Sequence, residues 1–433
     1  MGHKIPVVGV AEPAAAARLA GLSLEATVAL ADVAGTIKDG LLAFASATGL
    51  VVMHQLLEAE LTERIGPKHA RIPARAGNRH GTTTGSVVLG GRRVRAERPR
   101  GRTRDGTEIA LDTWAAFSAD DLLTQLVMER MLAGVATRRH ADVAEPIGEE
   151  LEARSSATSR SAVSRRFVRA TTRALDELMA RDLSELDTAV LMIDGIVVAG
   201  QCCVAALVIT TDGRKVPVGL WLGDTENRTV VTDLLADLQA RGLSAERGLL
   251  AVIDGGKALA TAVRKVFDKQ ALIQRCTLHK RRNVAGYLSK EIAGRIDRRL
   301  ASAFNHPDPA AGLARARSIA AELEADHPDA AASLREGLEE MFTVRRLGVD
   351  GRLARTLTST NAIESMISVA CTTMANVKRW RDGTMKKRWV AAGVLEAERS
   401  FRRLKGCRDM PVLVAALRQA TGIRPTQYDE EAA

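Results

Sequence analysis

The spacing of hydrophobic and polar residues changes character along the chain. Residues 1 to about 70 carry apolar and charged positions at helical intervals and predict short helices. From Arg71 to Arg104 the sequence is rich in glycine and arginine, which predicts a basic, turn-rich segment around a short strand at Gly85–Leu89. Helical spacing returns between residues 120 and 187. The first part of the chain is therefore expected to be mainly helical and basic.

One stretch of this helical region, Ala157–Phe167, begins with hydroxyl side chains that suit a helix cap and continues as an amphipathic helix with arginines. That layout fits a helix-turn-helix motif, in which the first turns of the second helix enter a DNA groove. A solvated basic helix in an ordinary helical domain would give the same pattern. Both interpretations stay open from the sequence.

The next region is the only one dense in strand patterns. The strand-like runs are 189–195, 203–210, 216–222, 248–256 and 271–275, with helical patterns at 229–241 and 258–267. The order β-β-β-α-β-α-β predicts a mixed α/β sheet of the ribonuclease-H kind, whose first three strands form an antiparallel meander. Residues 281 to about 355 predict an all-helical insertion, and helices at about 361–379 and 384–404 follow.

Composition limits the class of protein and of partner. The 433 residues are 46% hydrophobic and 26% charged, which is the balance of a globular protein rather than a disordered one. With 62 Lys and Arg against 52 Asp and Glu, the net charge of +10 favours nucleic acid as partner, and a membrane surface second. The longest uncharged apolar stretch, Leu41–Met53, is too short to span a bilayer, so no transmembrane helix is expected.

The five cysteines are odd in number and irregularly spaced. They do not form the pattern of a disulfide framework and fit a reducing cytosol.

Three carboxylates stand at positions where a fold of this kind brings chain segments together. Asp194 follows the apolar run of the first strand, Asp254 that of the fourth, and Glu364 lies in the first turn of a late helix. If the first and fourth strands are neighbours, these acids can share divalent cations, as two-metal phosphoryl transfer requires. Mg²⁺ suits such oxygen ligands. Each acid also has a structural explanation: a hairpin turn at Asp194-Gly195, a helix cap at Asp254, and a capping box from Asn361 to Glu364.

Cys276 and His279 form a second candidate site just after the last strand. Two ligands are half of a tetrahedral zinc site, and no second close Cys/His pair is present in the sequence, so zinc is the weaker interpretation. In a more specific interpretation, His279 faces the three carboxylates and contacts substrate phosphate or the attacking water. A packed, hydrogen-bonded histidine would explain it equally.

Basic residues in four segments are candidates for DNA contacts. They are Arg92, Arg93 and Arg95; Arg160, Arg165 and Arg166; Lys280, Arg281 and Arg282; and Lys378 and Arg379, with Trp380 beside them to stack on an unpaired base. A tryptophan here can also simply anchor its helix in the protein core. This structural explanation is stronger for Trp389, further along the chain, than for Trp380.

The motifs resemble those of the Mutator-type bacterial insertion-sequence transposases, which carry an Asp, Asp, Glu triad on a ribonuclease-H-like fold. The residues that carry the resemblance are Leu191-Met192-Ile193-Asp194-Gly195, Val252-Ile253-Asp254-Gly255-Gly256, Gln274 to Asn283 with Cys276 and His279, and Ser359-Thr360-Asn361-Ala362-Ile363-Glu364-Ser365. The gap between Asp254 and Glu364 is nearly twice that between the two aspartates, and it holds the helical insertion.

The resemblance implies that Asp194, Asp254 and Glu364 hold two Mg²⁺ (or Mn²⁺) ions, and that Cys276 and His279 form the family's Cys/Asp-x-x-His signature. It also implies that the protein binds terminal inverted repeats, cuts a strand and joins the 3′ hydroxyl to target DNA, acting as a homodimer on DNA in the bacterial cytoplasm, near the nucleoid. No membrane partner or small-molecule substrate is indicated. The alternatives are a non-catalytic helix-turn-helix regulator, and a ribonuclease-H-fold nuclease or resolvase that cuts without joining.

The expected organisation has six segments. They are a basic DNA-binding region (1–115), a helical region with the candidate helix-turn-helix (116–186), the first part of the catalytic core (187–285), the helical insertion (286–356), the final core helices with Glu364 (357–405) and a C-terminal tail (406–433).

Overall fold

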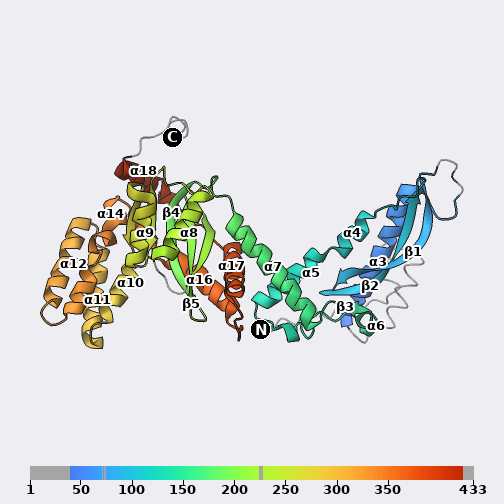
Figure 1. Ribbon diagram of the computed structural model, residues 1–433, viewed down its shortest axis with the longest axis horizontal. Coiled ribbons are helices and arrows are strands. Elements are labelled where there is room, and N and C mark those ends of the chain that lie inside the picture. The colour runs from blue at the N-terminus through green and yellow to red at the C-terminus, as the bar shows by residue number, and fades with distance from the viewer. Residues whose placement is uncertain (1–39, 71, 73–74, 224–227, 423–433) are drawn as a thin grey trace, which may run out of the picture. The chain divides into compact units, whose positions relative to one another are not determined.

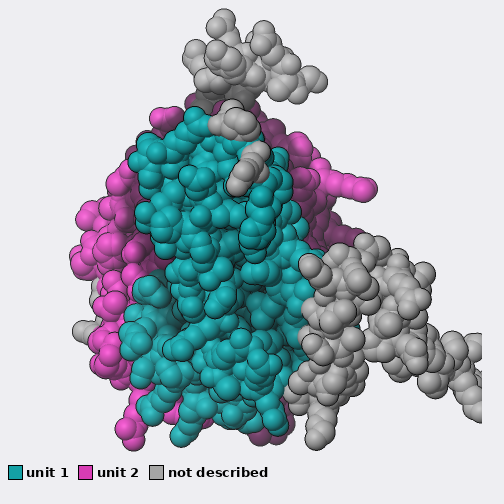
Figure 2. Space-filling view, turned by 90° about the vertical axis from the view of Figure 1, so that its right-hand side faces the viewer, with its two compact units in different colours: residues 1–170 teal, residues 171–433 magenta. Residues whose placement is uncertain are grey.

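A computed structural model describes residues 40–70, 72, 75–223 and 228–422. The chain divides into two compact units, residues 1–170 and 171–433 (Figure 2). Most of the short helices predicted near the start, Arg71 and the end of the C-terminal tail lie outside the described residues. The finer division into six segments stays a prediction.

The first unit is built on a long hairpin that the sequence predicted only in part. Strands β1 (Gly77–Leu89) and β2 (Arg92–Thr103) pair antiparallel over nearly their whole length (Figure 1). Gly90 and Gly91 have φ of +54° and +73°, as a two-residue turn that follows the strand twist requires. The expected turn-rich segment is therefore wrong, because arginines at many positions of β2 hide its strand alternation.

Helix α3 (Gly40–Ile65) packs on this hairpin, and its buried residues Met53, Leu57 and Leu61 join Val87 of β1 in one core cluster. By length and composition alone, α3 is also apolar enough to cross a membrane. The expectation of no such helix was based on the uncharged stretch, whereas α3 extends further, through a more charged second half. The packing against β1 accounts for one of its apolar faces.

The rest of the first unit is helical, as predicted, but its arrangement is not that of a helix-turn-helix. The helices are α4 (Asp112–Ser118), α5 (Asp120–Leu132), η2 (Thr137–Arg139), α6 (Glu149–Ala153) and α7 (Arg160–Ala180), which ends in the second unit. Between α6 and α7, the short strand β3 (Ser155–Ser156) pairs with β2. The chain before α7 is thus held in a sheet and does not form a tight turn between two packed helices.

The second unit contains the mixed α/β sheet expected from the sequence. Its elements are β4 (Thr188–Val198), β5 (Gln201–Thr210), β6 (Lys215–Gly223), α8 (Arg228–Ala240), β7 (Leu249–Ile253), α9 (Lys257–Phe267), η3 (Asp268–Gln270) and β8 (Ala271–Arg275). The strand order is β6-β5-β4-β7-β8, antiparallel from β4 to β6 and parallel from β4 to β8. The predicted succession of strands and the neighbouring of the first and fourth strands are confirmed.

The two faces of the sheet are covered by different helices (Figure 1). Leu191 and Ile193 of β4 belong to the core cluster that includes the apolar faces of α8 and α9. Because side chains alternate along a strand, Asp194 lies on the other face. On that side α16 (Asn361–Met374) contacts β4, and α17 (Gly383–Arg399) packs against α16.

The chain between β8 and α16 is helical throughout, and most of its apolar side chains form a separate core cluster. Its elements are α10 (Thr277–Ala285), α11 (Lys290–Phe304), α12 (Pro309–Leu323), α13 (Pro328–Arg335), η4 (Leu338–Phe342), α14 (Thr343–Arg346) and α15 (Gly351–Leu357). After α17 come η5 (Cys407–Asp409) and α18 (Met410–Thr421). The all-helical segment predicted from residue 281 to about 355 is confirmed.

Leu234 tests the core beneath the sheet, because it is fully buried on α8. We expect Leu234→Ala to lower the free energy of unfolding by about 2–5 kcal/mol through lost burial and a residual cavity. Val197→Ala is the control, since Val197 is 75% exposed on β4, and it should change stability by less than about 0.5 kcal/mol. Urea denaturation followed by circular dichroism measures both, and equal effects would contradict the assigned core.

Candidate active site

The register of two parallel strands brings the two aspartates together. Ile193 of β4 pairs with Ile253 of β7, so Asp194 and Asp254, the next residues along, stand side by side on the same face. Asp194 does not end its strand as expected, because β4 continues to Val198 through pairing with β5. Asp194 lies one residue beyond the last pair between β4 and β7.

The structural explanations considered for the two aspartates do not hold. The hairpin after β4 turns at Ala199-Gly200, with φ of +45° and +79°, and not at Asp194-Gly195. Gly256, rather than Asp254, is the N-cap of α9. Asp254 Oδ1 instead accepts a 2.8 Å hydrogen bond from the Gly256 amide across a sharp turn.

Glu364 is brought to the acids by the first turn of α16. The helix is preceded by Thr360 as N-cap, whose hydroxyl donates a 2.5 Å hydrogen bond to Glu364 Oε1. The expected capping box from Asn361 is therefore not formed, and the carboxylate is held by a side chain one turn before it. Thr360 was not identified as a site residue, although it lies in one of the motifs that carried the family resemblance.

The pKa of Asp194 reflects the charges of the other two carboxylates, Asp254 and Glu364. Burial is the main cause that raises the pKa of Asp194 to about 6, and the negative charges of Asp254 and Glu364 contribute in the same direction. A hydrogen bond from the Gly195 amide, 2.8 Å from Asp194 Oδ1, and the charge of His279 act in the opposite direction. A cluster of this kind is unfavourable as three charges alone and favours a bound cation.

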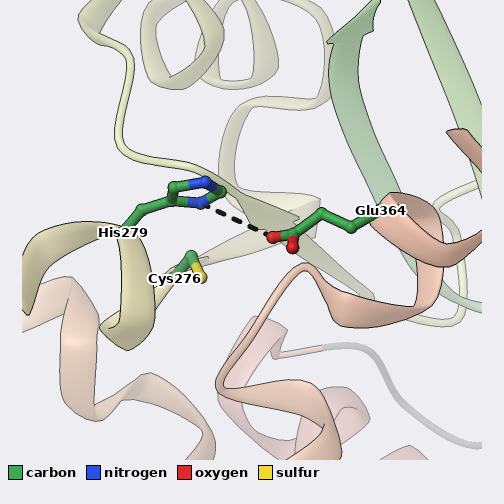
Figure 3. A group of neighbouring side chains, drawn as sticks. All are labelled: Cys276, His279 and Glu364. Carbon is green, nitrogen blue, oxygen red and sulfur yellow. Dashed lines mark ion pairs between the residues drawn. The ribbon is translucent and has the colours of Figure 1, made fainter. Parts of the chain in front are cut away.

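Cys276 and His279 join this cluster from the first turn of α10. The Cys276 amide donates a 2.7 Å hydrogen bond to Ile253 O, which fixes it beside the end of β7. His279 Nδ1 lies 3.8 Å from Glu364 Oε1 and 3.3 Å from the hydroxyl of Thr360 (Figure 3). The prediction that His279 faces the acids is consistent with this geometry.

The thiol and the imidazole interact directly. The hydrogen bond with Cys276 raises the pKa of His279 to about 9, with the charges of Glu364 and Asp254 adding to it against the effect of burial. Burial acts to raise the pKa of the Cys276 thiol, but hydrogen bonds with His279 and Thr360 together lower it. Both shifts have the same cause, since the hydrogen bond between the two side chains favours a protonated imidazole beside the thiol sulfur.

The predicted DNA contacts divide into engaged and exposed side chains. Five of the basic residues are held by other parts of the protein: Arg92 by Glu145 O and Glu152, Arg93 and Arg166 by Asp120, Lys280 by Ser333 O and Glu336 O, and Arg281 by Asp297. Trp380 packs edge-on against the buried Trp389, with ring centroids 6.5 Å apart. The exposed ones are Arg95, Arg160, Arg165, Arg282, Lys378 and Arg379.

The comparison with known families agrees with the motifs. A family model described as "Transposase, Mutator family" matches residues 22–390. Because the match covers most of the chain, the protein belongs to the Mutator family of transposases.

Individual relatives are more distant. The chain is 25% identical over 215 residues to a probable insertion-sequence transposase of Corynebacterium diphtheriae, a stretch covering 49% of this chain and 61% of that protein. It is 28% identical to the transposase for ISRM3 of Rhizobium meliloti, over 40% of this chain and 42% of the relative. For the IST2 transposase of Acidithiobacillus ferrooxidans the identity is 27%, over 38% and 54%. The chain thus spans less than two thirds of the length of these relatives.

Gln274 connects the site to the helical insertion and was not singled out from the sequence. Its buried amide donates hydrogen bonds of 2.7 Å to Arg275 O and 2.9 Å to Met341 O, and it accepts one of 2.9 Å from the Val344 amide. The signal that could have found it is a polar residue directly after the three apolar residues that begin β8.

Replacing Gln274 by leucine should leave buried backbone groups of η4 and α14 unpaired. We expect Gln274→Leu to destabilise the protein by about 3 kcal/mol in urea denaturation, because each unsatisfied buried group carries a desolvation cost. Gln270→Leu serves as the matched control, because Gln270 is an exposed glutamine shortly before Gln274 in the chain. A negligible difference between the two variants would show that the hydrogen bonds do not hold the insertion.

Proposed function

We propose that the protein is a DNA transposase that binds the terminal inverted repeats of an insertion sequence, cuts a strand there and joins the freed 3′ hydroxyl to target DNA. The observation that carries the proposal is the convergence of Asp194, Asp254 and Glu364 from two paired strands and a packed helix. The strand order of the sheet, with three antiparallel strands followed by two parallel ones, supports a ribonuclease-H-like core. Membership of the Mutator family supports the same activity.

The donor set fits two Mg²⁺ or Mn²⁺ ions, because carboxylate oxygens are the ligands these hard cations prefer. Asp194, Asp254 and Glu364 would hold them. When bound, such ions activate the attacking oxygen and stabilise the leaving one. Thr360 orients Glu364 through its hydroxyl, and the Gly195 and Gly256 amides orient the two aspartates.

His279 is the residue of the site best placed to meet the substrate. Its side chain is 26% exposed and its pKa is raised to about 9, so it carries a proton at neutral pH. A protonated imidazole beside the acids would contact the scissile phosphate, as proposed from the sequence, and would partly balance the carboxylates.

DNA binding is proposed for the exposed basic residues of both units. The hairpin β1–β2 and helix α7 are the candidates for the terminal repeats, and Arg282, Lys378 and Arg379 for DNA next to the acids. Two element ends must be handled together, so a homodimer on DNA is proposed, acting on bacterial DNA in the cytoplasm.

Substitution of each acid tests the triad. Asp194→Ala, Asp254→Ala and Glu364→Ala should each abolish cleavage and strand transfer, while binding of a labelled element end stays within about twofold of the unmodified protein, on the order of 0.4 kcal/mol. The assay uses the labelled end, a target plasmid and Mg²⁺. Asp268→Ala is the control, because this exposed aspartate lies outside the site.

The products of the same assay separate the rival functions. A label joined to the plasmid supports a transposase, a label cut but never joined indicates a nuclease or resolvase, and a bound, uncut label indicates a regulator. Strand transfer by any one of the three acid variants would contradict the triad.

The exposed arginines of α7 predict a second result. Arg165→Ala should weaken end binding and reduce the slope of log affinity against log salt by about one, since one phosphate contact is lost. Arg317→Ala, an exposed arginine outside the predicted DNA surface, should leave the slope unchanged. Fluorescence anisotropy at several salt concentrations measures the slopes, and equal slopes for the two variants would remove α7 from the interface.

A further inference from the structure

Cys276, His279 and Glu364 form a ligand set that differs in chemistry from the three carboxylates. One ligand atom from each of these residues lies within 4.8 Å of those of the other two (Figure 3). The sequence offered only the first two ligands and made a zinc site the weaker interpretation. The third comes from α16, far along the chain, and is supplied by the fold.

These donors suit a soft divalent cation and not Mg²⁺. Thiolate and imidazole are the common ligands of Zn²⁺ in proteins, whereas Mg²⁺ takes oxygen ligands almost exclusively. Three protein ligands with a fourth position open to solvent is also a frequent zinc arrangement. In a carboxylate site for Mg²⁺, neither Cys276 nor His279 would be a useful ligand.

The three ligands differ in their exposure to solvent. Cys276 is fully buried, while the side chains of His279 and Glu364 are 26% and 31% exposed. A cation can therefore enter past the imidazole and the carboxylate and reach the sulfur last. The 3.8 Å between His279 Nδ1 and Glu364 Oε1 leaves these two atoms close enough to share one ion after small rotations.

The position of the set is fixed from two directions. The Thr277 amide and hydroxyl both donate to Thr358 O, at 2.9 and 3.0 Å, which ties the start of α10 to the chain just before α16. Because Cys276 and Glu364 flank this connection, their separation does not depend on the rest of the insertion. The ligands are thus preorganised in the absence of an ion.

The geometry points to a binding site for Zn²⁺ or a similar soft cation, formed by Cys276 Sγ, His279 and Glu364, that shares Glu364 with the carboxylate site. An ion bound there would engage Glu364 Oε1 and compete with the hard cations of the proposed function for this one side chain. This competition rests on the proposed function, whereas the soft site itself does not.

Cobalt is the probe, because Co²⁺ replaces Zn²⁺ and gives a thiolate charge-transfer absorption that reports sulfur ligation directly. The metal-free full chain is titrated with Co²⁺ without DNA. We expect the thiolate band to appear with one ion per chain and to disappear when Zn²⁺ is added. Absence of the band, or its persistence at full strength in Cys276→Ser, would overturn the proposal.

Two matched variants complete the test. Cys371→Ser removes an exposed cysteine outside the site and should leave the band unchanged. His279→Gln should weaken Co²⁺ binding at least about tenfold, since even outer-shell changes cost that much. If Cys276→Ser does not fold, as judged by circular dichroism, His279→Gln decides, and unchanged affinity in that variant would overturn the site.

Addition of Mg²⁺ distinguishes failure of this proposal from failure of the proposed function. If both are right, excess Mg²⁺ lowers the apparent affinity for Co²⁺, because the two sites share Glu364. If the carboxylates do not hold Mg²⁺, the cobalt band forms and Mg²⁺ does not weaken it, which contradicts the proposed function and supports the soft site alone. If the soft site is wrong, no thiolate band forms at any Mg²⁺ concentration.

Discussion

The pairing of β4 with β7 is the constraint on which the rest of the site depends. A slip of one residue would turn Asp194 or Asp254 to the opposite face of the sheet and bury its carboxylate against α8 and α9. Every residue of β7 is buried, so such a slip would also expose apolar side chains or crowd the core. The hydrophobic effect along a five-residue strand therefore fixes the position of two charged groups.

That arrangement has an electrostatic cost, which the surrounding groups offset only in part. Backbone amides at Gly195 and Gly256 donate to the aspartates, and Thr360 donates to Glu364. The raised pKa of Asp194 indicates that burial and mutual repulsion still outweigh these hydrogen bonds. The protein thus gathers like charges where the proposed chemistry needs a cation, which is a common trade between stability and function.

Much of this could be predicted from the sequence, and the limits have physical causes. Strand order and the placement of the acids follow from apolar runs that end in Asp, because burial of a central strand leaves a clear local pattern. The hairpin β1–β2 was missed in part because arginines interrupt that pattern. Burial of Arg166 and Lys280, and the role of Gln274, depend on partners distant in sequence, and no local pattern records them.

The hydrogen bonds from Thr277 to Thr358 O also bear on how this protein family can change. They hold the two ends of the helical insertion next to each other. The insertion therefore leaves and rejoins the α/β fold at one point, and it has its own core. Closing a longer or shorter loop at a fixed point costs little, since the entropy varies only with the logarithm of length. The insertion can therefore grow, shrink or be exchanged during evolution while the acids on either side of it stay in place.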